Sequence, residues 1–161
     1  MKKRSTSTKS GSTLFLKFVI VLLAIAVAAL CIFALPAGIR SENAGMYRPI
    51  LLGMYIPAIP FFIALFQGFK LLNYIDSNKV FSQASVRSLK VIKYCGIAIS
   101  VLYAAGMPYI FSVAERDDAP GVVLLGCIFI GASLSVGTAA AIFQKLLQNV
   151  VDIKSENELT V

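Results

Sequence analysis

Residues 18–39 read FVIVLLAIAVAALCIFALPAGI, a run of 22 residues that contains no Asp, Glu, Lys or Arg. Three further charge-free stretches, 49–69, 94–114 and 119–144, also lack these four residue types. A helix needs roughly 20 apolar residues to cross a hydrocarbon core about 30 Å thick, and all four stretches reach that length. The sequence therefore predicts an all-α membrane protein, a bundle of four transmembrane helices at about 14–37, 49–74, 83–114 and 120–150.

Composition supports the same fold class. The chain has 161 residues, of which 58% are hydrophobic and 14% charged, whereas soluble domains average about 45–50% apolar and about 25% charged residues. Only about 70 residues lie outside the four stretches, divided among loops and tails, so no loop can fold as a separate domain. We expect one membrane domain over 14–154, preceded by a disordered, polar cytosolic tail over 1–13 and followed by a polar C-terminal tail over 155–161.

The distribution of Lys and Arg predicts the orientation, because basic residues accumulate on the cytoplasmic side of membrane proteins. Twelve lie in inside segments if the N-terminus is cytoplasmic: Lys2, Lys3, Arg4, Lys9, Lys17, Lys70, Lys79, Arg87, Lys90, Lys93, Lys145 and Lys154. Only Arg40, Arg48 and Arg116 then lie outside. We expect a plasma-membrane protein with both termini in the cytoplasm. Its positive charge meets an anionic inner leaflet, so no direct nucleic-acid contact is needed.

The residue types that the chain lacks exclude most catalytic chemistry. It contains no His, so an imidazole base or metal ligand is excluded. Its cysteines, Cys31, Cys95 and Cys127, lie in different spans without a C-x-x-C spacing, and we expect them to be free packing residues. No nucleophile has a base beside it, and no charge-free stretch holds a carboxylate. We therefore expect no enzyme activity, no catalytic, metal-binding or cofactor-binding residue, and no ion coupling.

Small residues recur at intervals of four in the last two spans. They are Gly96, Ser100 and Ala104 in the third span and Ser133, Gly137 and Ala141 in the fourth. Small residues let transmembrane helices approach closely. We therefore expect the third and fourth spans to make the closest contact, within a monomeric bundle.

Two prolines, Pro57 and Pro60, lie inside the second predicted span. Each removes a backbone donor and crowds the preceding turn, which predicts a bend in this helix. The pattern fits either a functional hinge or a bend that suits the packing of the bundle.

The inside segment 71–93 contains a helix start that precedes the membrane. Ser82 is placed to cap a helix that begins at Gln83. Along this helix Arg87, Lys90 and Lys93 form a basic stripe beside an apolar stripe of Val86, Leu89 and Ile92. This pattern is typical of a helix that lies at an anionic interface, so we expect the basic stripe to contact lipid headgroups. A specific protein partner is the alternative.

The fourth helix is expected to project into the cytosol as well. Phe143, Leu146, Leu147, Val150 and Ile153 share one broad face, with polar residues opposite. Such an amphipathic extension serves either interfacial packing or docking.

Two motifs resemble those of a known family. The stretch 74–82, YIDSNKVFS, is similar to the inter-span motif of the bacterial membrane family catalogued as domain of unknown function 2975, although that family often has Gly and Pro before the Phe-Ser pair. The ending 156–161, ENELTV, resembles its acidic and apolar C-terminus. The resemblance covers most of the chain beyond about Leu14 and implies no established activity. Members are often encoded beside a small helix-turn-helix regulator, which implies a membrane partner for a transcription factor.

Two classes of function fit these features. One is a non-enzymatic regulatory or scaffold protein that recruits a soluble cytosolic regulator through segment 71–93 and the residues after Gln144. The other is a small oligomeric transporter or channel. The amphipathic cytosolic elements and the resemblance favour the first. The expected contact residues are Asp76, Phe81, Ser82, Arg87, Glu156, Asn157 and Leu159.

Overall fold

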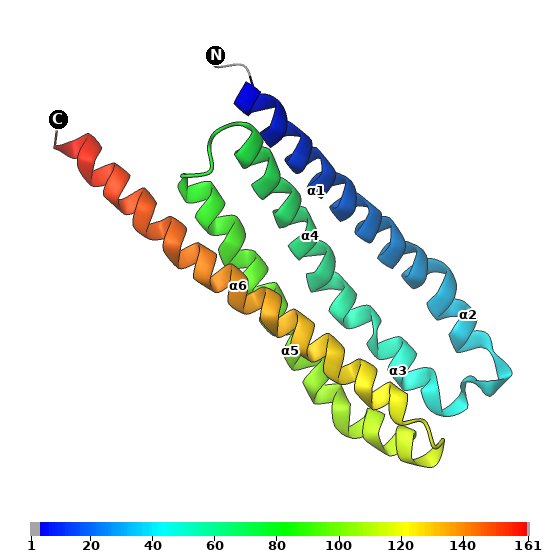
Figure 1. Ribbon diagram of the computed structural model, residues 1–161. Coiled ribbons are helices and arrows are strands. Elements are labelled where there is room, and N and C mark those ends of the chain that lie inside the picture. Colours follow the sequence, from blue (N-terminus) through cyan, green and yellow to red (C-terminus); the bar gives the residue numbers. More distant parts are fainter. Residues whose placement is uncertain (1–3, 161) are drawn as a thin grey trace.

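The computed structural model describes residues 4–160, which form a bundle of four antiparallel helical spans without a strand (Figure 1). All four spans are long and apolar enough to cross a membrane, which confirms the predicted fold class. In chain order the elements are α1 (Arg4–Ala29), a π-helical turn (Leu30–Ala34), α2 (Leu35–Arg40), a 3₁₀ segment (Glu42–Tyr47), α3 (Arg48–Gly53), α4 (Tyr55–Asp76), α5 (Gln83–Arg116) and α6 (Pro120–Leu159).

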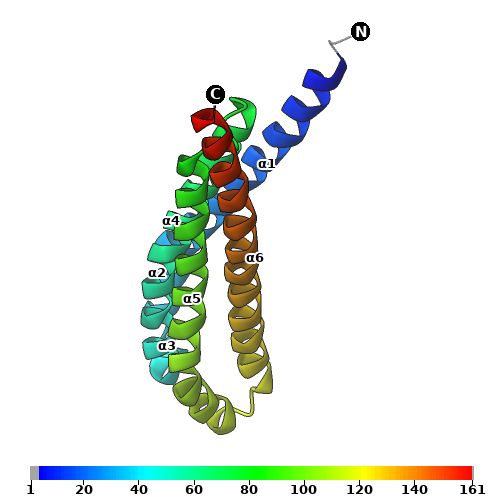
Figure 2. The same cartoon turned by 90° about the vertical axis from the view of Figure 1, so that its left-hand side faces the viewer.

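Both chain ends and the α4–α5 loop lie at one end of the bundle, here called the terminal end (Figures 1 and 2). The 3₁₀ segment and the α5–α6 turn lie at the opposite end. One tyrosine joins the 3₁₀ segment to this turn, and a second joins it to α5. The Tyr47 hydroxyl donates to the Asp117 carboxylate, and the Tyr109 hydroxyl donates to the Met46 carbonyl at 3.1 Å. The loops at this end are therefore tied to each other although each is short.

The first span is continuous to Arg40, beyond Pro36 and Gly38, but it contains a π-helical turn. The Leu35 N–H donates to the Leu30 carbonyl, five residues back. In an α-helix it would donate to the Cys31 carbonyl, four residues back. Pro36, five residues after Cys31, has no N–H that could donate to the Cys31 carbonyl instead. The Tyr55 hydroxyl of α4 donates to this Cys31 carbonyl at 2.9 Å. The two spans are thus joined where the backbone of the first leaves an acceptor without its usual donor.

The second span is interrupted at Met54, between α3 and α4. A proline ring clashes with the carbonyl four residues earlier, and for Pro57 that residue is Gly53, the last residue of α3. Pro60 is accommodated inside α4. The predicted distortion is confirmed, and it falls one turn before the first proline.

Helices α5 and α6 make the most extensive contact in the bundle, as predicted, and run side by side (Figure 2). A Cβ atom built on Gly96 would lie 2.8 Å from the Gly137 Cα and from the Ser133 carbonyl oxygen. The two backbones therefore touch at this point. Ser100 is buried and Ala141 is half-buried, whereas Ala104 is exposed. A spacing of four residues rotates by about 40° per step on a helix of 3.6 residues per turn, so Ala104 leaves the contact face.

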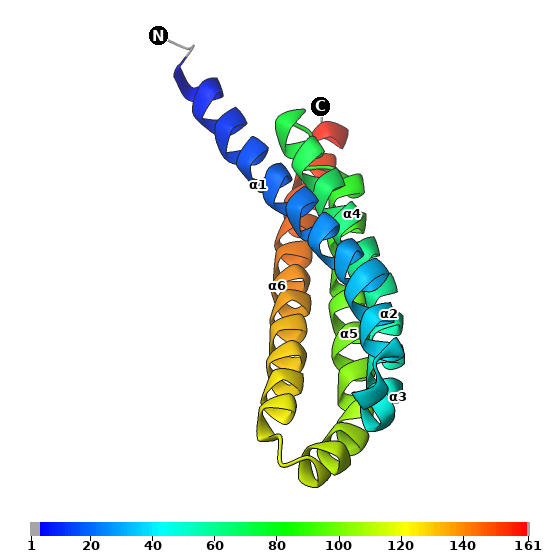
Figure 3. The ribbon, with the colours of Figure 1, turned by 90° about the vertical axis from the view of Figure 1, so that its right-hand side faces the viewer.

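Helix α1 begins at Arg4, and its first turns extend away from the other helices (Figure 3). Residues 4–13 are therefore helical, where a disordered tail is expected, and residues 1–3 of that tail lie outside the described residues. A tertiary contact at Thr13 helps to explain this early helix. Thr13 is buried, and its hydroxyl donates to the Asp76 carboxylate of α4 at 2.5 Å. The helix therefore has a tertiary anchor before the charge-free stretch begins.

Helix α6 continues to Leu159, although a polar tail is expected from residue 155. Local side-chain bonds support these last turns. Gln148 donates to Asp152 at 2.7 Å, and Lys154 lies 4.0 Å from Glu158, one turn further on. All three cysteines are free, as predicted, but only Cys95 is buried; Cys31 is half-buried and Cys127 is exposed, so the expected packing role does not hold for Cys127.

Candidate functional site

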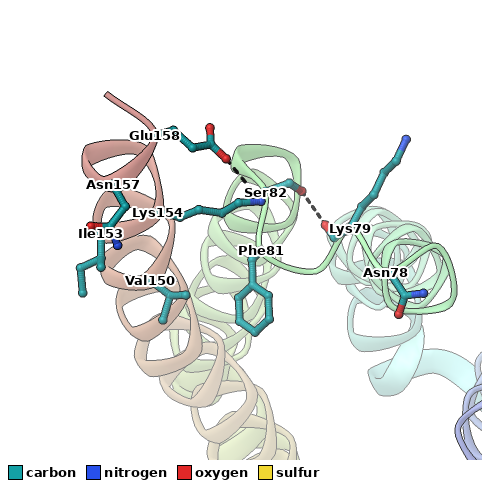
Figure 4. A pocket seen from close by; sticks show the side chains of 9 residues that line it. All are labelled: Asn78, Lys79, Phe81, Ser82, Val150, Ile153, Lys154, Asn157 and Glu158. Atoms are coloured by element: carbon teal, nitrogen blue, oxygen red, sulfur yellow. Dashed lines mark hydrogen bonds and ion pairs between the residues drawn. The ribbon is translucent and has the colours of Figure 1, made fainter. Parts of the chain in front are cut away.

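A groove of about 840 Å³, here called the terminal groove, lies between the α4–α5 loop and the last turns of α6 (Figure 4). It brings together two segments that are far apart in the sequence. The loop side consists of Asn78, Lys79, Phe81 and Ser82, and the α6 side consists of Val150, Ile153, Lys154, Asn157 and Glu158.

The way in which α4 ends determines the shape of the loop. Asn78 has a φ of 53°, in the left-handed region. Its N–H bonds to the Ile75 carbonyl at 3.2 Å, and the Lys79 N–H bonds to the Tyr74 carbonyl at 2.8 Å. These two bonds form a Schellman motif, in which Asn is the usual substitute for Gly. Asn78 therefore makes the tight turn without a glycine.

Ser82 caps α5, which confirms the predicted helix start at Gln83. Its hydroxyl oxygen accepts from the Ser85 N–H at 3.4 Å, and the hydroxyl donates to the Lys79 carbonyl at 2.8 Å. The cap thus fixes the loop from both sides. Phe81 is held between the turn and the cap, and its ring extends into the groove while remaining 55% exposed (Figure 4).

The α6 wall of the groove is apolar at its floor and charged at its rim. Val150 and Ile153 are 43% and 60% exposed, respectively. They lie five and eight residues beyond Lys145, the first charged residue after the fourth apolar stretch. At 1.5 Å per residue this places them about 8–12 Å further along the helix. Lys154 and Glu158 supply rim charges of both signs, and their own exposed ion pair adds little stability.

The structure unites only part of the set of expected contact residues. Phe81, Ser82 and Asn157 line the groove, whereas Glu156 and Leu159 lie on the same last turns of α6 outside its lining. Arg87 is exposed on α5, away from the groove. The groove residues outside the expected set are Asn78, Lys79, Val150, Ile153, Lys154 and Glu158. Positions 150, 153, 154 and 157 share one helical face, and this spacing could have indicated from the sequence that they line the same surface.

Asp76 lies apart from the groove and joins α4 to α1. One carboxylate oxygen accepts from the Thr13 hydroxyl, and the other accepts from the Lys17 ammonium at 2.5 Å. The hydrogen bond from Lys17 has the largest effect on the pKa of Asp76 and that from Thr13 the next largest, and both hold this pKa below its usual value. Both oxygens are thus engaged within the chain.

The basic stripe of α5 faces outward, but its apolar neighbours do not. Arg87 and Lys90 are exposed, and the Lys93 ammonium lies 5.3 Å from the centre of the Tyr94 ring. Val86 and Leu89 are only 6% and 8% exposed. The apolar stripe therefore packs within the bundle and not into lipid, because α4 and α6 pack against α5.

Comparisons with known proteins identify the family. A family model described as "Protein of unknown function (DUF2975)" matches residues 32–161. The chain is also 50% identical over 157 residues to the "Uncharacterized membrane protein YoaS" of Bacillus subtilis (strain 168), covering 93% of this chain and 98% of that protein. No solved structure matches the chain. The family resemblance of the loop and the C-terminus is confirmed, and this chain belongs to the DUF2975 family of membrane proteins, whose function is unknown.

Proposed function

We propose that this protein is a non-enzymatic regulatory or scaffold protein that recruits a soluble cytosolic protein to the plasma membrane through the terminal groove. The single observation that carries the proposal is the exposed apolar floor of the groove, formed by Phe81, Val150 and Ile153. Apolar residues cluster on a water-facing surface chiefly where a partner covers them.

The proposal places the terminal end in the cytoplasm. The twelve-to-three distribution of basic residues supports this orientation. Since Val150 and Ile153 lie about 8–12 Å beyond Lys145 along the helix, the groove then reaches past the hydrocarbon core, where lipid tails do not cover it.

The chemistry of the groove indicates the kind of partner. An apolar floor with a rim of Lys79, Lys154 and Glu158 suits an amphipathic helix whose polar side carries both charge signs. A small helix-turn-helix regulator could supply such a helix from a surface other than its DNA-reading one. The headgroup-facing residues Arg87, Lys90 and Lys93 would hold α5 at the anionic leaflet while the partner binds.

Affinity capture from membranes tests this function. The intact protein is compared with a double variant of the groove, Phe81→Ala with Ile153→Ala, and with a chain truncated after Asn149. A matched control, Phe66→Ala with Leu146→Ala, removes similarly exposed side chains outside the groove. A true partner is a soluble protein that is retained by the control and lost from both other forms.

The captured protein is then purified and its affinity is measured directly. Loss of two buried apolar contacts is expected to weaken binding by at least about tenfold. If no soluble protein shows this dependence, and vesicles that contain the purified protein show selective solute flux, then the recruitment function fails and an oligomeric transporter or channel takes its place.

A further inference from the structure

A second cavity, of about 610 Å³, lies inside the apolar part of the bundle. Its walls come from α1, the π-helical turn, α2, α4, α5 and α6, as well as from Met54. Every lining residue except Ile92 belongs to one of the four charge-free stretches. The cavity therefore lies at the depth of the hydrocarbon core.

The cavity is open on one side. Helix α1 packs on α4, and α6 packs on α5, so α1 and α6 are the outer helices of the arrangement (Figure 1). Lining residues on these outer parts are well exposed, among them Leu23 at 44% and Val136 at 54%. Pro57 and Gly96, which line the cavity from α4 and α5, are buried. The opening thus faces the bilayer between α1 and α6.

The walls offer few polar groups. The hydroxyl of Ser133 already donates to the Phe129 carbonyl of its own helix at 2.7 Å, and the Cys31 carbonyl already accepts from Tyr55. The Tyr103 ring stacks on Phe129, with a centroid separation of 5.3 Å. The other lining side chains with an O–H or S–H group are Tyr103 and Cys31, so the walls are mainly apolar and suit hydrocarbon better than water, which needs two to four polar partners.

Both backbone irregularities of the first two spans border this cavity. Leu30 and Cys31 belong to the π-helical turn, and Met54 is the break between α3 and α4. Such turns occur frequently at functional sites. The Tyr55 hydroxyl donates to the Cys31 carbonyl, so this carbonyl of the cavity wall has a hydrogen-bond donor although the backbone there departs from a regular α-helix.

We propose that this cavity is a binding site for one hydrocarbon chain of a membrane lipid, which enters sideways between α1 and α6. The volume favours this occupant over a helix of a second copy. A helix about 10 Å across would fill 610 Å³ with about 8 Å of its length, roughly five residues. A single chain of carbon atoms, which pack about 4 Å apart, fits the space.

The absence of Trp from the sequence allows a direct test. Phe61→Trp places a single fluorescent reporter in the cavity wall, and Phe66→Trp places one on the outward, lipid-facing side of the same helix. Leu65→Trp is a second cavity reporter if the first variant does not fold. Each variant is reconstituted in phosphatidylglycerol vesicles whose acyl chains carry bromine at mid-chain, which quenches Trp on contact.

The expected result is strong quenching of both the cavity and the outward reporters. Adding Ala132→Phe, at the mouth of the cavity on α6, should reduce quenching of the cavity reporter only. The matched control is Ala105→Phe, an exposed position of α5 outside the lining, and it should leave both signals unchanged.

A second arm identifies the source of the chain. Plain phosphatidylglycerol vesicles doped with a brominated free fatty acid quench the cavity reporter if the occupant is a free acid, whereas a phospholipid chain is indicated by quenching in the first arm alone. The proposal is overturned if the cavity reporter is quenched in neither arm, which would mean that protein covers the cavity. It is also overturned if Ala132→Phe does not change its quenching.

Discussion

Replacing Gly96 by Ala tests the contact between α5 and α6, which organises the bundle. A Cβ at this position would lie 2.8 Å from the Gly137 Cα, 2.8 Å from the Ser133 carbonyl oxygen and 2.9 Å from the Gly137 nitrogen. All three are backbone atoms, so no side chain can rotate away. Non-bonded carbon atoms pack about 3.5–4.0 Å apart, which means that the two helices must separate by roughly 1 Å to admit the methyl group.

The expected cost follows from two opposing effects. Overpacking of this kind costs about 1–3 kcal/mol, while Ala in place of Gly inside a helix gains about 0.5–1 kcal/mol. We therefore expect Gly96→Ala to reduce the free energy of unfolding by about 1 kcal/mol, within a range of about 0–2.5 kcal/mol. Gly106 lies on the same helix, and a Cβ added there would meet no atom within 4 Å. Gly106→Ala should keep the favourable effect alone and raise stability by about 0.5–1 kcal/mol.

Gly137→Ala gives an intermediate case. Its Cβ would lie 3.3 Å from the Lys93 carbonyl oxygen and 3.4 Å from the Ile97 nitrogen, so shifts of a few tenths of an ångström are sufficient. Reversible unfolding in mixed detergent micelles, followed by the loss of helical circular dichroism, measures all three variants. The predicted order of stability is Gly106→Ala, then Gly137→Ala, then Gly96→Ala. Equal stability of the Gly96 and Gly106 variants would refute the backbone contact.

Three further predictions concern other parts of the molecule. Tyr55→Phe removes the donor to the Cys31 carbonyl and should lower stability by about 1–3 kcal/mol, as measured by the same unfolding assay. Because the Lys17 ammonium, followed by the Thr13 hydroxyl, lowers the pKa of Asp76, the stabilisation that this carboxylate gives to the contact of α1 with α4 should be complete above the usual Asp pKa of about 3.9 and be lost as the pH falls through the lowered value. Cross-linking between α1 and α4 measures this, and Asp76→Asn should weaken the contact at neutral pH. Reporter fusions at both termini should signal a cytoplasmic location, and an extracytoplasmic signal at either one would contradict the proposed orientation.

Local features of the terminal groove could be predicted in part. Ser82 as the cap and Gln83 as the helix start follow from short-range hydrogen bonding, and the structure confirms both. That Phe81 lines one groove with Val150 and Ile153 could not be predicted, because the α4–α5 loop and the end of α6 come together only when α6 runs antiparallel to α5. The bonds of Asp76 could not be predicted either, since its two partners, Thr13 and Lys17, come from a helix far away in the sequence.

The four spans follow from local composition alone, because a stretch of about 20 uncharged apolar residues has one stable arrangement in a bilayer, a helix whose backbone groups bond to each other. The close packing of α5 and α6 also follows from the sequence, since small residues are needed wherever two backbones meet. Which small residues touch depends on how the helices pack: Gly96 contacts Gly137, while Ala104 rotates out of the contact. The tertiary structure likewise decided that Val86 and Leu89 face protein, and that α1 and α6 leave an opening to lipid. In a membrane both surroundings are apolar, so hydropathy does not distinguish a lipid-facing side chain from a buried one.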